Sequence, residues 1–251
     1  MKRVGFLGCG KIGKALVKEL QKKENVEIAF IQDPVLVSKE GIGCPVVSAP
    51  QKALYEKTDL IIECAIASAL EENLEIILKN CDLLMFSVTA FSKIEFKEKA
   101  EKLCEQYGHH IYIPHGAILG IDGIFDGNKI WNEVTIETRK NPKSLGRNDT
   151  VCSVVYEGTT REACKLYPRN VNVHATIAMA GIGFDKTKSK IISDPSVETN
   201  EHTISLKGDG IDFKIHISSL AGGAVTGAYT PYSACGSLNR VIGNGEKILF
   251  V

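Results

Sequence analysis

The sequence has no excess of charge, no long apolar run and no close pair of cysteines. Its 30 basic and 30 acidic residues give a formal net charge of zero at pH 7, and no run of like charge could follow a polyanion. Nucleic acid is therefore not expected as a partner. The apolar stretches are too short for a membrane span, and the first residues lead into a glycine-punctuated strand rather than a signal peptide. We expect a soluble cytoplasmic protein.

The cysteines are scattered along the chain, at positions 9, 44, 64, 81, 104, 152, 164 and 235. They form no Cys-x-x-Cys pair, and no histidine lies near them at metal-ligand spacing, so the sequence predicts no metal site. Without a secretory signal, scattered cysteines are more often reduced and buried than joined in disulfides. This usage favours a reducing compartment.

The first half of the 251 residues alternates apolar, strand-like runs with amphipathic, helix-like stretches. Strands are predicted at 3–7, 26–32, 46–47, 60–64, 83–88 and 111–113, and helices at 11–22, 70–79 and 95–107. Continuous apolar strands separated by helices are typical of a parallel sheet that is covered on both faces. We predict an α/β fold whose first domain, residues 1–115, is a doubly wound Rossmann sheet.

After His115 the regular helical crossovers disappear. Strands are predicted at 134–139, 150–156, 189–192, 202–206 and 213–217, and helices at 160–166 and 171–180. We expect a second α+β domain over residues 116–233, with an antiparallel or mixed sheet and helices on one face, for substrate binding and dimerisation. A helix at 234–241 could return to the first domain, so residues 234–251 are expected to pack on it.

A glycine motif lies between the first predicted strand and helix, with the sequence Gly8-Cys-Gly-Lys-Ile-Gly13. Gly8 permits a tight turn, Gly10 lets the backbone approach a pyrophosphate, and Gly13 lets the helix pack closely on the strand. The N–H groups at the helix start, at Lys11 and Ile12, would bind the phosphates. The motif predicts a dinucleotide site; a glycine-rich turn without a ligand is the alternative.

Asp33 ends the second predicted strand, about 20 residues beyond the glycine motif, where a carboxylate binds the adenine ribose of NAD and repels the 2′-phosphate of NADP. It could instead simply begin an Asp-Pro turn. No arginine follows it, so NAD is favoured, although Lys39 could allow some use of NADP. Ligands bind beyond the carboxyl ends of parallel strands, so Cys64, Ala65 and Ser87 are expected to line the nicotinamide half.

Several segments together resemble the L-aspartate dehydrogenase family. In the first domain they are residues 59–65, 87–91 and 114–117, and in the second they are 138–142, 156–173, 180–188, 194–195 and 200–202. The second-domain segments are the more specific, because unrelated enzymes share the Rossmann motif. The resemblance covers residues 1 to about 217. Residues 218–233 depart from it, since the family's Asn-Pro-rich segment is replaced by one rich in glycine, alanine and serine.

The resemblance implies an NAD(P)-dependent oxidoreductase that oxidises L-aspartate, or a similar small dicarboxylate, at C2. The product, iminoaspartate, would hydrolyse to oxaloacetate and ammonia or enter pyridine nucleotide (NAD) biosynthesis. The resemblance also implies that Ala117 and Asn172 contact the cofactor and that His202 is the active-site residue. A homodimer is expected, because a sheet-bearing second domain often provides a two-fold interface.

Removing a hydride from C2 requires a neutral amine and later proton transfers, so a group that titrates near neutral pH is useful. His202 is an even number of residues from Ile204 and Leu206, so on a strand the three side chains lie on the same face. This predicts that the side chain of His202 is buried. A lone histidine in such a position is more often a satisfied core residue than a catalyst. His115 would stand beside the nicotinamide, where the family commonly has serine, and could share proton transfer or fill space.

The other histidines carry weaker signals. His216 alternates with apolar residues and belongs on the polar face of its strand. His109 and His110 fall in a connection that we expect to be solvated. His174 lies on a helical stretch where the family usually has a small residue, which favours a packing or peripheral position.

A substrate with two carboxylates needs cationic side chains. The candidates are Lys186 and Lys188, with Arg139 and Lys140 behind them, and each could equally be a solvated surface charge. Two other functions stay open. One is a related dehydrogenase or reductase on another small amino or oxo acid, in the manner of homoserine dehydrogenase or dihydrodipicolinate reductase. The other is a non-catalytic NAD-binding sensor, which would not need His202.

Overall fold

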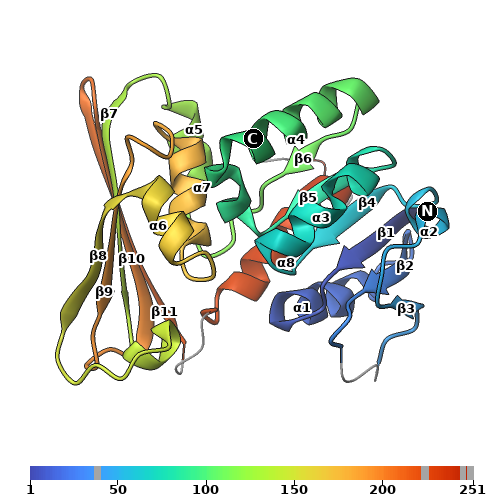
Figure 1. Ribbon diagram of the computed structural model, residues 1–251, viewed down its shortest axis with the longest axis horizontal. Helices are drawn as coiled ribbons and strands as arrows, with labels where there is room; N and C mark the ends of the chain where they lie inside the picture. The colour runs from blue at the N-terminus through green and yellow to red at the C-terminus, as the bar shows by residue number, and fades with distance from the viewer. Residues whose placement is uncertain (37–40, 222–225, 244–246, 248–251) are drawn as a thin grey trace. The chain divides into compact units, whose positions relative to one another are not determined.

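The computed structural model describes residues 1–36, 41–221, 226–243 and 247 (Figure 1). The chain forms two compact units. Unit 1 comprises Met1–Pro114 and the C-terminal segment from Pro231, and unit 2 comprises His115–Thr230. Within the described residues, no helix has both the length and the apolar character needed to cross a membrane.

Unit 1 is built on a six-stranded sheet in the order β3-β2-β1-β4-β5-β6, in which all neighbours are parallel. Its strands are β1 (Lys2–Leu7), β2 (Val26–Gln32), β3 (Val46–Val47), β4 (Leu60–Glu63), β5 (Asp82–Met85) and β6 (Ile111–Tyr112). Its helices are α1 (Lys11–Leu20), α2 (Lys52–Tyr55), α3 (Ala67–Leu78), α4 (Ile94–Tyr107) and α8 (Thr230–Ile242), with a short 3₁₀ helix, η1 (Val88–Ser92). The strand order reverses between β1 and β4, and the predicted Rossmann fold is confirmed.

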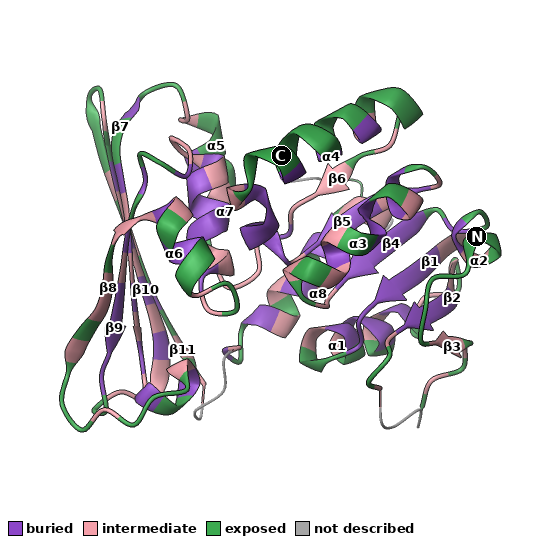
Figure 2. Ribbon diagram, in the orientation of Figure 1, coloured by how far each residue is buried: buried purple, intermediate pink, exposed green. Residues whose placement is uncertain are grey.

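The central strands of unit 1 are buried on both faces, which explains why they are continuous apolar runs in the sequence (Figure 2). The C-terminal helix α8 contributes Ala234 and Leu238 to the same core, where they pack with Val4 of β1 and Leu16 of α1. The core of this unit therefore contains residues from its first strand and from its last helix.

Unit 2 contains a five-stranded mixed sheet in the order β11-β10-β7-β9-β8, in which β7 and β9 are parallel and the other neighbours antiparallel. Its strands are β7 (Trp131–Lys140), β8 (Ser153–Thr159), β9 (Lys188–Ser193), β10 (Thr199–Gly208) and β11 (Ile211–Leu220). Its helices are α5 (Ile121–Asp126), α6 (Thr160–Leu166) and α7 (Asn172–Ala180), with a 3₁₀ helix, η2 (Pro142–Leu145). The α-helices lie on one face of the sheet, as expected (Figure 1).

The helix-covered face of this sheet has an apolar half and a polar half. Strand periodicity places every second residue on one face. The apolar half is a core cluster that includes Val134 and Ile136 of β7 and Ile204 and Leu206 of β10. Further along the same strands the inward positions are polar but still buried, and they are Thr138, Lys140, Asn200 and His202. Polar groups are rarely buried without a purpose, so the polar half is where a site is to be sought.

Several predicted strands have shifted ends, as two examples show. The strand expected at 83–88 ends at Met85, because the backbone N–H groups of Phe86 and Ser87 donate to the carboxylate of Glu63. The strand expected at 150–156 instead spans Ser153–Thr159 and leads directly into α6. The short helices α2 and α5 were not predicted, since so few residues carry no clear helical period.

We predict that Leu238→Ala lowers the free energy of unfolding by about 2–5 kcal/mol, the usual cost of a cavity in a packed core. Leu238 is 0% exposed, whereas Tyr232 on the same helix is 78% exposed. Tyr232→Ala is the matched control and should change stability by less than about 0.5 kcal/mol. Urea denaturation followed by circular dichroism measures both. Equal losses would contradict the packing of α8 in the core of unit 1.

Candidate active site

The glycine motif forms a turn that is open where a ligand would approach. Gly8 has a φ of 85°, and a Cβ there would lie 2.8 Å from the backbone nitrogen of Ala65. A Cβ on Gly13 would lie 3.0 Å from the carbonyl oxygen of Gly8, so helix and turn pack as closely as expected. At Gly10, the N-cap of α1, a Cβ would meet no atom within 4 Å, and no side chain caps the helix. This open helix start, formed by Lys11 and the residues after it, fits a pyrophosphate.

Asp33 follows β2 and lies beside this turn. Its Oδ2 accepts a hydrogen bond of 2.8 Å from the backbone nitrogen of Cys9, and its Oδ1 accepts one of 2.9 Å from that of Val35. The carboxylate thus stabilises the Asp-Pro turn and also adjoins the glycine motif, so the two interpretations of Asp33 are compatible. Ile12 lies in the first turn of α1, and Lys39 falls outside the described residues.

Glu63, which was not among the residues predicted for the site, is a fully buried carboxylate at the end of β4. It accepts hydrogen bonds from the backbone nitrogens of Ala65, Phe86 and Ser87 at 2.8, 3.0 and 2.9 Å, and from the Ser87 hydroxyl at 2.8 Å. Burial raises its pKa, and these hydrogen bonds oppose that shift. Glu63 therefore holds the ends of β4 and β5 together. This positions Ala65 and Ser87, and also Cys64, which lies between Glu63 and Ala65. An acidic residue that ends an apolar strand was the available signal.

His202 lies on the covered face of β10, opposite Thr138 of β7. It is 3% exposed, so its predicted burial is confirmed. The Thr138 hydroxyl lies 2.8 Å from Nδ1 of His202 and 2.7 Å from Nε2 of His174, a fully buried residue of α7. His174, for which the sequence favoured packing or the periphery, is thus hydrogen-bonded to the same hydroxyl as His202.

The electrostatics of this polar half favour neutral imidazoles beside a cation. Burial, and then the charge of Lys140, lower the pKa of His174 to about 3 and hold that of His202 well below its ordinary value. Lys140 is itself 3% exposed, and burial lowers its pKa to about 8. Both imidazoles are therefore neutral at neutral pH, while the ammonium group attracts anions.

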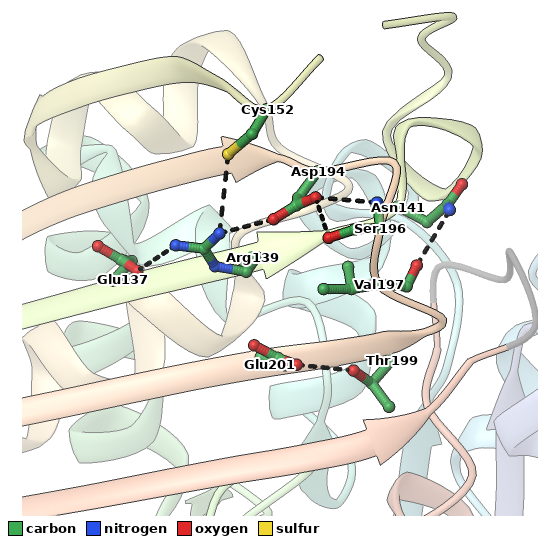
Figure 3. Close-up of polar contacts among 9 residues, drawn as sticks. All are labelled: Glu137, Arg139, Asn141, Cys152, Asp194, Ser196, Val197, Thr199 and Glu201. Atoms are coloured by element: carbon green, nitrogen blue, oxygen red, sulfur yellow. Dashed lines mark hydrogen bonds and ion pairs between the residues drawn. The ribbon is translucent and has the colours of Figure 1, made fainter. Parts of the chain in front are cut away.

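The other cationic candidates lie elsewhere. Lys186 and Lys188 are exposed, and Lys188 is on the face of β9 opposite to that of the buried Ser189. Arg139 follows the inward Thr138 on β7, so its side chain lies on the opposite face of the sheet. Its guanidinium donates a hydrogen bond of 2.6 Å to the carboxylate of Asp194 (Figure 3). Of the four predicted cations, Lys140 alone shares a buried face with His202.

Three further predicted residues lie at the start of unit 2 and of α7. Nε2 of His115 is 2.7 Å from Oδ1 of Asp122, and its side chain is 23% exposed. The carbonyl oxygen of His115 accepts from the backbone nitrogen of Ile118, which closes a turn around Ala117. Asn172 opens α7, the helix that carries His174. Among the described residues, no three histidine, cysteine, aspartate or glutamate side chains are grouped as metal ligands would be.

Models of known families match both units. The model described as homoserine dehydrogenase, NAD binding domain, matches residues 8–114. The model described as aspartate dehydrogenase, C-terminal, matches residues 126–241.

Individual relatives agree with these matches. The chain is 33% identical to the L-aspartate dehydrogenase of Methanococcoides burtonii over 230 residues, which are 83% of this chain and 84% of that protein. It is 32% identical to that of Archaeoglobus fulgidus over 249 residues, 99% of each chain. The crystal structure of aspartate dehydrogenase from Thermotoga maritima matches at a TM-score of 0.81 and 30% identity, with 100% of both chains covered. The chain therefore belongs to the L-aspartate dehydrogenase family.

Proposed function

We propose that this protein is an NAD-dependent L-aspartate dehydrogenase that oxidises C2 of aspartate to iminoaspartate. The observation that carries the proposal, beside membership of the family, is the polar half of the covered face in unit 2. There a buried imidazole, His202, and a buried ammonium group, Lys140, share one side of the sheet. The iminoaspartate would hydrolyse to oxaloacetate and ammonia or enter NAD biosynthesis.

The proposed NAD site lies at the carboxyl ends of the strands of unit 1. Gly8, Gly10 and Gly13, with the first N–H groups of α1, would hold the pyrophosphate, and Asp33 would accept from the adenine ribose. Bound NAD supplies the acceptor for the hydride from C2. In unit 1 the nicotinamide half is assigned to Cys64, Ala65 and Ser87, which follow strands. In unit 2 the family resemblance implies cofactor contacts at Ala117 and at Asn172, which opens α7. Asp33 favours NAD over NADP.

The residues of unit 2 would handle the substrate's charge and protons. The amine of aspartate must be neutral before the hydride leaves, and the imidazole of His202 is proposed to accept its proton. Lys140 would bind a substrate carboxylate. Burial and the charge of Lys140 keep the pKa of His202 low, so a carboxylate beside Lys140 would offset that charge and make His202 a stronger base. Substrate binding would thereby activate the base.

We favour Lys140 over Lys186 and Lys188 for this role because the desolvated ammonium group interacts more strongly with an anion than an exposed one does. His115, oriented by Asp122, is a second candidate for proton transfer, and filling space is its alternative. We further propose a homodimer in the cytoplasm; a broad sheet in unit 2 is a common basis for a two-fold contact.

The proposal is tested by absorbance of NADH at alkaline pH with aspartate, then with homoserine and other small amino acids. We expect reduction of NAD with aspartate and a lower Michaelis constant for NAD than for NADP. Turnover only with another amino acid would favour the related dehydrogenase, and NADH binding without any turnover would favour a sensor. A preference for NADP would contradict the role given to Asp33.

We predict that His202→Ala lowers kcat about a hundredfold or more, the usual scale for loss of general acid–base help. NADH binding, followed by fluorescence, and the circular dichroism spectrum should be unchanged. His216→Ala is the control, because His216 is an exposed histidine on the next strand. Unchanged turnover of the His202 variant would exclude its catalytic role.

Lys140→Met should raise the Michaelis constant for aspartate about tenfold or more, because a charge-assisted contact to a carboxylate is lost. Lys190→Met is the matched control: Lys190 lies on β9 and pairs with Glu157 at 3.4 Å. Steady-state kinetics with varied aspartate and saturating NAD compare the two. Equal Michaelis constants in the two variants would assign the carboxylate contact to another cation.

A further inference from the structure

The buried hydroxyl and imidazole groups of unit 2 form one continuous chain of hydrogen bonds. The chain begins at the carbonyl oxygen of Thr187, which lies 3.1 Å from Oγ1 of Thr160. Oγ1 of Thr160 lies 2.7 Å from Oγ of Ser189. That Oγ is 2.9 Å from Nδ1 of His174. The chain then continues from Nε2 of His174 through the Thr138 hydroxyl to Nδ1 of His202, as described above. We call this series the hydroxyl–imidazole chain.

The direction of every hydrogen bond follows from the carbonyl end. A carbonyl oxygen only accepts, so the Thr160 hydroxyl donates to Thr187. A hydroxyl donates one hydrogen, so Oγ1 of Thr160 must accept from Ser189. Because the one hydrogen of the Ser189 hydroxyl is donated to Thr160, its oxygen must accept from Nδ1–H of His174.

The remaining hydrogen bonds, from His174 to His202, have fixed directions for the same reason. His174 is neutral, since burial lowers its pKa to about 3, and with hydrogen on Nδ1 its Nε2 has a lone pair. That nitrogen accepts the Thr138 hydroxyl hydrogen. Oγ1 of Thr138 is left to accept from Nδ1–H of His202, which is also neutral.

We propose that the hydroxyl–imidazole chain holds His202 in the Nδ1–H tautomer, which leaves Nε2 as the nitrogen that accepts the substrate proton, and that His174 is the positioning residue of this chain. The inference rests on the proposed role of His202 in aspartate oxidation. In most histidines of this kind the tautomer is set by the bond that the other nitrogen makes. Here it is set through four side chains by one backbone carbonyl.

The burial of the linking groups makes this arrangement hard to reverse. Thr138, Thr160, His174 and Ser189 are each at most 1% exposed, so water is poorly placed to replace a missing partner. If His202 carried its hydrogen on Nε2, every group in the chain would have to turn, and the Thr160 hydroxyl could no longer donate to the carbonyl. The Thr187 carbonyl oxygen would keep its 3.0 Å hydrogen bond from the backbone nitrogen of Thr160. The buried Thr160 hydroxyl oxygen and the carbonyl oxygen would, however, face each other at 3.1 Å without a hydrogen between them, which is costly.

The test reads the tautomer directly, by ¹⁵N NMR of protein labelled at histidine, with His202 assigned from its absence in the His202→Ala variant. We expect the wild-type protein to show a protonated Nδ1 and an unprotonated Nε2. Nε2–H as the main form of His202 would overturn the proposal.

Two substitutions of His174 separate a positioning role from simple packing. His174→Gln can still accept from Thr138 and donate to Ser189, and should keep the Nδ1–H tautomer and most of the turnover. In His174→Leu the Thr138 hydroxyl is free to donate to His202, so the hydrogen of His202 should move to Nε2 and kcat for aspartate should fall at least about tenfold, because a wrong tautomer impairs catalysis. The same tautomer in both variants would contradict the proposal.

Thr138→Val provides a second break in case His174→Leu fails to fold. It removes the acceptor of Nδ1–H and should give the same loss of kcat, with an unchanged Michaelis constant for NAD. The matched control is Thr203→Val, which removes a 3.0 Å contact from a threonine hydroxyl to Nδ1 of His216 outside the chain. The control should keep both tautomer and turnover, and an equal loss in both variants would count against the chain.

The tautomer is measured without aspartate or NAD, so the two proposals can fail separately. Absence of aspartate turnover with an Nδ1–H signal at His202 would remove the proposed function and leave the chain intact. Aspartate turnover with an Nε2–H signal at His202 would leave the proposed function intact and overturn the proposed role of the hydroxyl–imidazole chain.

Discussion

The Thr138 hydroxyl lies between two buried imidazole nitrogens, and because it has one hydrogen it must donate to one nitrogen and accept from the other. This constraint ties β7, β10 and α7 together at the polar half of the sheet. It also links the protonation of His202 to that of His174, so neither ring can change tautomer independently.

Both units bury polar groups and satisfy them with internal hydrogen bonds. In unit 1 the Glu63 carboxylate is satisfied by backbone N–H groups from the ends of two strands, which orders the loops at the proposed cofactor site. In unit 2 hydroxyls and imidazoles satisfy one another on the face whose other half is an apolar core. In each case rigid strands supply the precision that the chemistry requires.

Membership of the L-aspartate dehydrogenase family accounts for the fold and the general chemistry. The arrangement around His202 rests on contacts between particular side chains. His174 and Ser189 are 15 residues apart, and their contact requires α7 to lie on the sheet at one particular place. The match to the aspartate dehydrogenase C-terminal model extends to residue 241, so it includes the segment 218–233 in which the sequence pattern was expected to depart from the family.

The sequence alone determined the βαβ unit with its glycine turn and the burial of His202, because backbone stereochemistry and strand parity act over a few residues. It also indicated the family. Only the tertiary structure decided which groups meet: Thr138 is 64 residues from His202 and 36 from His174, and strand register brings them together. For the same reason it separated Lys140 from Lys188: parity shows which residues of one strand share a face, but only the assembled sheet shows that Lys140 and His202, on different strands, lie on the same buried face.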